Sequence, residues 1–175
     1  MLGDGDGRFL SQLLAANGTL CATAVDISAK MLNLLRARCA PYSERLRIMH
    51  SDALTFKQDT AGPYDLAVSH FFLDCLTQDQ LDQLVQRTAP ALSPGALWLI
   101  SDFNVPEGPL RLPARLFVSS LYLAFRILTG LRVNRLPDHA AALTSTGFSR
   151  IVRREFLGGL LFTELWQIDQ QSNTV

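Results

Sequence analysis

Short apolar segments alternate with amphipathic segments along most of this chain, and this alternation limits the folds that it can adopt. The strand-like segments lie at residues 20–25, 45–50, 65–68 and 96–101. Apolar residues at helical spacing occupy residues 8–16, 28–41, 77–91 and 138–146. Strands that alternate with helices favour a parallel sheet covered on both faces. The sequence therefore predicts an α/β fold with a doubly wound, mostly parallel sheet.

Local signals refine this outline. Ser28 and Thr77 are typical helix N-caps, and Ser93-Pro94-Gly95 is expected to separate a helix from the strand at 96–101. Gly158-Gly159 separates strand-like runs at 149–156 and 160–167, which predicts a C-terminal antiparallel hairpin. We expect one domain over residues 1–175, with a lid or substrate-side insertion at 108–137 that contains a helix at about 114–128, and a frayed tail at 169–175.

Polar residues follow four of the predicted strands at their carboxyl ends. These residues are Asp26, Asp52, His70 and Asp102. In an open parallel sheet, ligands bind outside the carboxyl ends of the strands. We therefore expect a binding site along this edge of the sheet.

The run Gly3-Asp4-Gly5-Asp6-Gly7 precedes the first predicted helix and is suited to close contact with a ligand. Its alternate glycines remove Cβ atoms from the ligand side of the loop. A dinucleotide fingerprint would place its third glycine one residue later, where Arg8 stands. The two aspartates would repel a pyrophosphate but suit a sulfonium or an ammonium group. Asp26, about 20 residues downstream at a strand end, is placed to accept hydrogen bonds from a ribose diol.

Six segments together resemble the class I S-adenosylmethionine-dependent methyltransferases. They are residues 2–9 (LGDGDGRF), 25–28 (VDIS), 51–53 (SDA), 64–70 (YDLAVSH), 95–103 (GALWLISDF) and 143–148 (LTSTGF). Residues 156–161 (FLGGLL) are loosely similar to the end of quinone-biosynthesis C-methyltransferases. The resemblance implies a Rossmann-like fold, S-adenosyl-L-methionine as cofactor, and methyl transfer to a small molecule.

It also implies a set of cofactor-binding residues. The glycine loop would line the methionine and ribose, Asp26 would bind the ribose hydroxyls, Ile27 would pack on the adenine, and Asp52 would meet its amino group. The complete set is Gly3, Asp4, Gly5, Gly7, Asp26, Ile27, Asp52, Ala53 and Ser69.

The acceptor would lie beyond the predicted strand that ends at His70. His70 is a candidate catalytic base or orienting group, and its alternative is a hydrogen-bonded loop histidine. Asp74 would orient His70 or cap the next helix. Five aromatic residues would form an apolar substrate pocket, or else pack in the core; they are Phe71, Phe72, Phe103, Phe117 and Tyr122. Tyr122 has the further alternative of binding a substrate oxygen.

Two features depart from the family pattern. The family usually has an acidic residue two positions before the first glycine, where this chain has Met1. In addition, only Met1 and Leu2 remain of the first, central strand. An N-terminally truncated form is therefore expected. A non-catalytic cofactor-binding or scaffold protein remains an alternative, as does an NAD-dependent oxidoreductase, which the position of Gly7 disfavours.

Charge and cysteine usage bear on partners and location. The formal net charge is zero, so no nucleic-acid partner is expected. The cysteines and histidines lack zinc-like spacing, so we expect no metal, buried structural thiols, and a reducing, cytoplasmic setting. Five arginines without an acidic residue among them lie within residues 110–137, namely Arg111, Arg115, Arg126, Arg132 and Arg135. They would either contact an anionic membrane surface peripherally or form a solvated face.

Overall fold

The computed structural model describes residues 1–56, 63–106, 108, 112, 116 and 136–169. The strands in this part of the chain are β1 (Ala22–Asp26), β2 (Leu46–His50), β3 (Tyr64–His70), β4 (Leu92–Phe103), β5 (Phe148–Phe156) and β6 (Leu161–Ile168). The α-helices are α1 (Arg8–Ala16), α2 (Ala29–Arg38), α3 (Gln78–Thr88) and α5 (His139–Ser145). Short 3-10 helices are η1 (Ala40–Arg45), η2 (Leu73–Cys75), η3 (Ala89–Ala91) and η4 (Leu157–Gly159).

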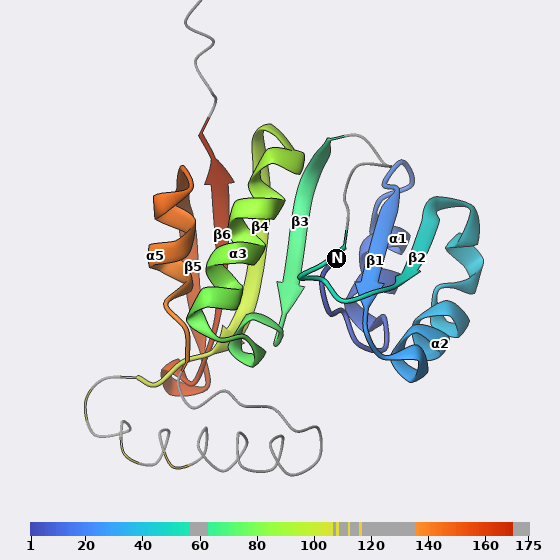
Figure 1. The fold of residues 1–175 in the computed structure, drawn as a ribbon. Helices are drawn as coiled ribbons and strands as arrows, with labels where there is room; N and C mark the ends of the chain where they lie inside the picture. The colour runs from blue at the N-terminus through green and yellow to red at the C-terminus, as the bar shows by residue number, and fades with distance from the viewer. Residues whose placement is uncertain (57–62, 107, 109–111, 113–115, 117–135, 170–175) are drawn as a thin grey trace, which may run out of the picture.

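The strands form a mixed sheet with the predicted polarity (Figure 1). β1 pairs in parallel with β2, and β3 pairs in parallel with β4. β6 lies antiparallel between β4 and β5, so the C-terminal hairpin forms the far edge of the sheet. The expected α/β class with a C-terminal antiparallel hairpin is confirmed.

Met1 and Leu2 lie between β1 and β3, where the family places its central strand. Leu2 forms parallel bridges to Val25 of β1 and Ser69 of β3. The Leu2 N–H donates to Val68 O at 2.8 Å, and the Val25 N–H donates to Met1 O at 3.0 Å. Beside this pair a small apolar cavity of about 40 Å³ lies between β1 and β3, and it is lined by Leu2, Val25, Phe56, Tyr64, Leu66 and Leu92 among others.

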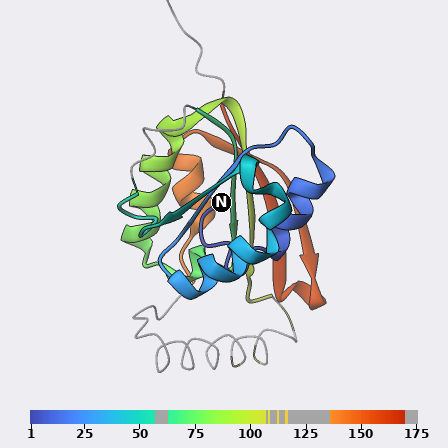
Figure 2. The ribbon, with the colours of Figure 1, turned by 90° about the vertical axis from the view of Figure 1, so that its right-hand side faces the viewer.

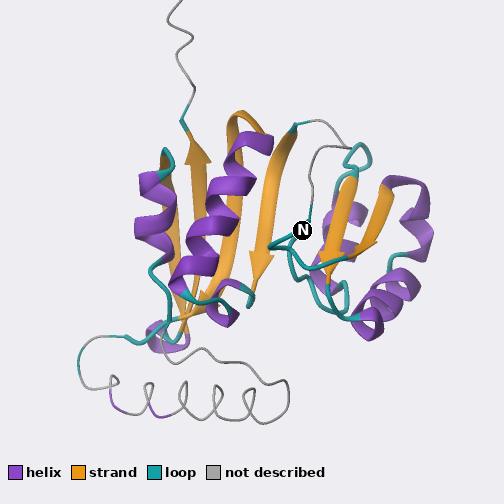
Figure 3. Cartoon of the chain, in the orientation of Figure 1, coloured by secondary structure: helices purple, strands orange, loops and turns teal. Residues whose placement is uncertain are grey.

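Helices cover both faces of the sheet, as expected from the alternation (Figures 2 and 3). On one face Leu10 and Leu14 of α1 pack with Leu35 of α2 against Ala24 of β1. On the other face α3 and α5 pack on a larger core that contains Trp98 and other buried residues of β4, β5 and β6. Figure 2 shows α1 on the side of the sheet opposite α3 and α5.

Capping residues set the beginnings of the helices largely as the sequence predicts. The Ser28 hydroxyl accepts a hydrogen bond from the Met31 N–H at the start of α2. Thr77 and Gln80 form a reciprocal capping box at the start of α3, which satisfies two otherwise unpaired N–H groups. Asp138 caps α5 by accepting a hydrogen bond from the Ala141 N–H.

Two expectations are wrong. Ser93-Pro94-Gly95 does not precede the strand but lies within it, because β4 begins at Leu92, which pairs with Tyr64 of β3. A register shift and the positive φ of Gly95 (77°) allow the strand to pass this irregularity. Cys21 is exposed, whereas Cys39 is buried as expected.

Some predicted features fall on residues that the structure does not describe. The insertion at 108–137 and the tail at 169–175 lie almost entirely there, and the helix at 114–128 is among them. Phe117, Tyr122 and the five arginines lie outside the described residues as well. Among the described helices, none has the length and apolar character needed to span a membrane.

Candidate functional site

The glycine loop leads from Leu2 into α1 with three residues in the left-handed region of φ. The φ angles are 65° at Gly3, 63° at Gly5 and 78° at Gly7. A Cβ on Gly3 would lie 2.5 Å from Phe72 Cδ2, and a Cβ on Gly7 would lie 2.8 Å from Leu35 Cγ. A Cβ on Gly5 would meet nothing within 4 Å. Gly3 and Gly7 therefore allow the loop to pack closely on the protein, while Gly5 borders open space.

The two loop aspartates have different surroundings. Asp6 pairs with Arg38 at 2.7 Å and with Arg8 at 3.0 Å, and the Arg38 guanidinium holds its pKa below the usual range. Asp4 Oδ2 is buried and has no hydrogen-bond partner in the described structure. Burial raises the pKa of Asp4 to about 6, although the N-terminal ammonium and the Leu10 N–H oppose this shift. Asp4 is thus a partly buried carboxyl, one oxygen of which is buried without a partner among the described residues.

β1 and β2 bring Asp26 and Asp52 to the same edge of the sheet. Asp26 Oδ1 accepts a hydrogen bond from the Ser28 N–H at 2.8 Å, which fixes the carboxylate at the end of β1. The next residue, Ile27, exposes 69% of its surface, and its carbonyl lies 2.9 Å from His50 Nε2. Asp52 Oδ1 accepts a hydrogen bond from the Leu54 N–H at 2.9 Å. An exposed apolar side chain between two held carboxylates suits the flat face of a nucleobase beside a ribose.

Two other predicted cofactor residues contribute mainly to the protein interior. Ala53 is buried within the larger core. Ser69 is 1% exposed, and its hydroxyl accepts a hydrogen bond from Trp98 Nε1 at 3.1 Å. The side chain of Ser69 therefore joins β3 to β4.

His70 ends β3 and is only partly buried. Its Nε2 atom is buried and has no hydrogen-bond partner in the described part of the chain. Phe9 of α1 contacts the imidazole edge-on, with ring centroids 4.3 Å apart. Burial, together with the N-terminal ammonium, lowers the pKa of His70, so the ring is neutral at pH 7. A neutral imidazole with one unused nitrogen is able to accept a proton or orient an acceptor.

Aromatic residues surround the end of β3, in part as expected. Phe71 has a positive φ of 50°, which is uncommon for a large side chain, and it is 47% exposed. Its ring lies 5.1 Å from that of Phe103 at the end of β4. Phe72 instead packs against Gly3. Phe71 and Phe103 therefore provide an apolar surface beside His70.

The sequence did not reveal the pairing of Asp74 with Asp102. The Asp74 N–H donates to Asp102 Oδ2 at 3.0 Å, and both residues are buried. The alternative that Asp74 caps the next helix is wrong, because Thr77 does so. Asp102 was visible as a strand-end residue, but no spacing rule links it to a residue of η2.

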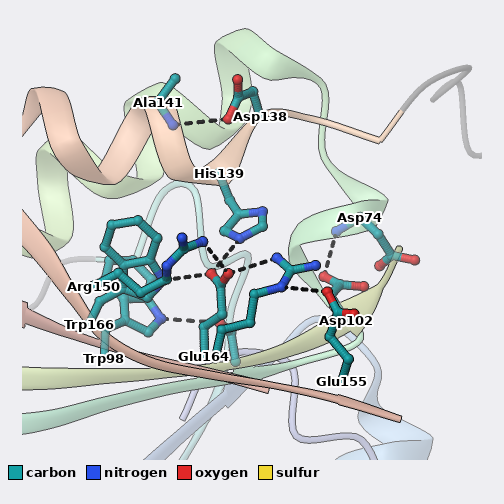
Figure 4. A network of polar contacts seen from close by, with 12 residues as sticks. Asp74, Trp98, Asp102, Asp138, His139, Ala141, Arg150, Glu155, Glu164 and Trp166 are labelled. Atoms are coloured by element: carbon teal, nitrogen blue, oxygen red, sulfur yellow. Dashed lines mark hydrogen bonds and ion pairs between the residues drawn. The ribbon is translucent and has the colours of Figure 1, made fainter. Parts of the chain in front are cut away.

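His139, Arg150, Arg153, Glu164 and Trp166 form a second group that the sequence did not indicate (Figure 4). The carboxylate of Glu164 is fully buried and accepts hydrogen bonds from the other four residues at 2.8 to 2.9 Å. Four hydrogen-bond donors compensate the burial of this charge. The network joins α5 to the C-terminal hairpin.

S-adenosylmethionine fits the edge formed by the glycine loop, β1 and β2. Gly5 borders open space, Asp4 Oδ2 has no described partner and could pair with a cation, and Ile27 exposes an apolar surface. The guanidinium groups of Arg8 and Arg38 are held by Asp6. The edge is therefore suited to a cationic nucleoside rather than to a pyrophosphate.

A sequence model for a family described as "Methyltransferase domain" matches residues 1–95, which is more than half of the chain. A search of curated protein sequences finds no relative.

Many solved structures share the fold. One is the N-methyltransferase NodS from Bradyrhizobium japonicum, with 15% identity, a TM-score of 0.67, and coverage of 97% of this chain and 84% of NodS. NodS has also been crystallised with S-adenosyl-L-homocysteine. The mitomycin 7-O-methyltransferase MmcR has 19% identity, a TM-score of 0.75, and coverage of 95% of this chain and 47% of MmcR.

A third is an O-methyltransferase family 2 protein from Planctomyces limnophilus in complex with apigenin, with 19% identity and a TM-score of 0.70. Its match covers 95% of this chain and 49% of that protein. The chain thus spans most of NodS but about half of the two O-methyltransferases. At these identities the likeness establishes the fold alone.

Proposed function

Because this chain belongs to the family of methyltransferase domains, which are S-adenosylmethionine-dependent enzymes, we propose that it methylates a small apolar or aromatic molecule. The observation that carries the proposal is the arrangement of the glycine loop, Asp26 and Ile27 along one sheet edge that ends beside His70. The apigenin complex of a protein with the same fold supports a small aromatic acceptor.

The roles of the binding residues follow from their surroundings. The open side of Gly5 lies along the methionine part, and Asp4 Oδ2 accepts a hydrogen bond from its ammonium group or faces the sulfonium. Asp26 accepts hydrogen bonds from the ribose hydroxyls because Ser28 already fixes the direction of its carboxylate. Ile27 covers one face of the adenine, and Asp52 and Ala53 border its amino edge.

When bound, the cofactor supplies an electrophilic methyl group on a positively charged sulfur. The protein must then align an acceptor with that group, and alignment alone supplies much of the rate. Phe71 and Phe103 hold the apolar part of the acceptor at the end of β3 and β4. His70, neutral and with an unused Nε2, orients the acceptor or removes its proton.

Calorimetry with S-adenosylhomocysteine tests the cofactor site. We expect saturable binding that weakens at least tenfold in Asp26→Ala. Asp65→Ala is the matched control, because Asp65 is an exposed carboxylate at the opposite end of β3, where it accepts a hydrogen bond from Ser93. Equal binding by parent and Asp26→Ala would refute this site.

A second experiment separates catalysis from binding. The protein is incubated with S-adenosylmethionine and a panel of small phenols, aromatic acids and aromatic amines, and S-adenosylhomocysteine formation is measured. Product formation that is lost in His70→Asn, with cofactor affinity unchanged, is expected. Tight cofactor binding without product from any member of the panel would favour a non-catalytic cofactor-binding protein.

A further inference from the structure

A second cavity lies at the carboxyl end of β4, on the α5 side of the predicted site. It has a volume of about 80 Å³ and is partly open to solvent. Its polar lining consists of Asp74, Asp102, Asn104 and His139, and Phe103 and Phe162 contribute to its apolar lining. These residues come from η2, β4, α5 and β6, so the tertiary fold creates the cavity.

The acidic wall of the cavity is built from two buried carboxyl groups. Asp102 is 4% exposed, and its two oxygens accept hydrogen bonds from the N–H groups of Asp74 at 3.0 Å and Phe103 at 2.8 Å. The Asp74 carboxyl, 6% exposed, also accepts a hydrogen bond from the Cys75 thiol at 3.5 Å. Burial and the neighbouring Asp74 charge raise the pKa of Asp102 well above its usual range. The pair therefore retains a shared proton at a pH where an exposed carboxyl is ionised.

The opposite wall is apolar and rigid. The His139 ring stacks on Phe162 with centroids 4.9 Å apart and an angle of 8° between the planes. Glu164 holds this imidazole through Nε2 at 2.8 Å. Figure 4 shows His139 reaching the region from α5, while Asp74 and Asp102 reach it from η2 and β4.

The charged groups around the cavity favour the binding of a cationic ligand. The nearby guanidinium groups of Arg150 and Arg153 pair with Glu164, and Arg153 also pairs with Glu155. No lysine or arginine occurs among the described residues that line the cavity. A carboxylate ligand would be repelled by the acidic wall, and a neutral hydroxyl would only hydrogen-bond to it. An ammonium group would form an ion pair with the carboxyl groups and take the place of the proton that they share.

We propose that this cavity binds the amino group of the methyl acceptor, with Asp102 and Asp74 as its partners and Phe103 and Phe162 against its apolar part. The inference rests on the proposed function and narrows the acceptor class to small alkylamines that carry an aromatic or apolar group. Phe103 connects the two regions, because it borders this cavity and also contacts Phe71 beside His70.

Calorimetry with two probes of equal size tests the preference for a cation. The probes are 2-phenylethylamine and 2-phenylethanol, each titrated at pH 7 into protein saturated with S-adenosylhomocysteine. We expect the amine to bind at least tenfold more tightly than the alcohol.

Substitutions at the two carboxyl groups test whether the amine binds in this cavity. Asp102→Asn is expected to reduce amine affinity at least tenfold and leave alcohol affinity within twofold, while Asp65→Asn changes neither. Equal affinity for the two probes, or full amine affinity in Asp102→Asn, would overturn the proposal. If Asp102→Asn does not fold, Asp74→Asn takes its place, with the same expected loss of amine affinity.

Titration with S-adenosylhomocysteine distinguishes a failure of the amine site from a failure of the proposed cofactor site. Asp102 is not among the residues assigned to the cofactor, so Asp102→Asn is expected to bind S-adenosylhomocysteine as the parent does. Loss of amine binding with normal cofactor binding supports the amine site. A parent protein that binds the amine but not S-adenosylhomocysteine would refute the cofactor site alone.

Discussion

At the scale of single residues, we expect Gly5 of the glycine loop to matter mainly for ligand binding and Gly7 to matter mainly for stability. Both have positive φ, so an alanine at either position costs about 1 to 2 kcal/mol in backbone strain. In Gly7→Ala the new Cβ also meets Leu35, which adds roughly 1 to 3 kcal/mol of overpacking. We expect Gly7→Ala to lower the urea midpoint more than Gly5→Ala. Gly5→Ala, in contrast, is expected to weaken S-adenosylhomocysteine binding at least tenfold, because its Cβ enters the ligand space.

Gly147→Ala is the matched control for this comparison. Gly147 has a φ of 84° and nothing within 4 Å of its added Cβ, and it lies between α5 and β5. It therefore reproduces the strain of Gly5→Ala without approaching the loop. If Gly147→Ala weakens ligand binding as much as Gly5→Ala, the effect comes from lost stability and Gly5 does not border the ligand.

We expect Asp4 to make cofactor binding depend on pH. Its pKa is raised to about 6 by burial, so the free protein holds Asp4 protonated below that value. The ammonium group of S-adenosylhomocysteine favours the charged form of Asp4, so the proton must leave when the ligand binds. Lowering the pH from 7 to 5 is therefore expected to weaken S-adenosylhomocysteine binding about tenfold, measured by calorimetry.

Two variants check the assignment of this pH dependence to Asp4. Asp4→Asn is expected to bind weakly and with a flat profile between pH 5 and 7. It should be at least as stable as the parent at pH 7, because ionising Asp4 costs stability as pH rises from about 4 to about 6. Asp6→Asn is expected to keep the slope, since Arg38 holds Asp6 ionised throughout this range. A parental slope in Asp4→Asn would contradict the assignment.

The sequence predicts residues whose role depends on local spacing. The glycine loop and Asp26 belong to this group, because turn geometry and the end of a strand are both local properties. The pairing of Asp74 with Asp102 could not be predicted, because it depends on how η2 folds back over the end of β4. For the same reason nothing in the sequence indicated that the Ser69 hydroxyl would bind Trp98.

At the scale of elements, the start of a helix was more predictable than the start of a strand. Ser28, Thr77 and Asp138 cap the N–H groups of their own helices, and such caps are visible within four residues of sequence. The first residue of β4 is set by its partner Tyr64, in another part of the chain. A proline and a glycine that normally end a strand are tolerated there because the pairing is irregular.

The Glu164 network makes the attachment of α5 to the C-terminal hairpin sensitive to acid. Burial alone would raise the pKa of Glu164, but hydrogen bonds from His139, Arg153 and Trp166 outweigh it and lower the pKa to about 2. Because the folded pKa lies below the unfolded value near 4.5, the stabilisation is present above pH 4.5 and is lost as pH falls towards 2. Glu164→Gln is expected to lose about 3 kcal/mol of unfolding free energy at pH 7.

Urea denaturation at several pH values measures this effect. The stability difference between parent and Glu164→Gln should shrink as pH falls from 5 to 2. Glu155→Gln is the control, because Glu155 is half exposed and contacts Arg153 alone in the network, so its loss should cost below about 1 kcal/mol. A difference between parent and Glu164→Gln that stays constant down to pH 2 would show that the charge of Glu164 does not stabilise the network.

At the scale of the whole molecule, the layered sheet was predictable, but the way its two parts meet was not. The pattern of strands and helices predicts parallel pairing and the final hairpin. It does not predict that backbone groups of Met1, Leu2 and Gly3 would join β1 to β3 beside an apolar cavity. β1 and β2 thus pair as a sheet of their own, although Val25 of β1 also packs in the larger core that contains Trp98.

This division predicts two levels of local stability, which hydrogen exchange followed by mass spectrometry measures. Peptides from β1 and β2 should exchange faster than peptides from β4 and β6, because β1 and β2 pair as a two-stranded sheet whereas β4 and β6 lie inside a four-stranded one. S-adenosylhomocysteine should slow exchange in β1 and β2 selectively, since the proposed site links Asp26 and Asp52 to the end of β3. Asp26→Ala with the same ligand should show little of this protection. Equal exchange rates in the two sheets of the free protein would contradict this prediction. They would mean that the molecule opens as one unit, so the cofactor could not stabilise β1 and β2 selectively.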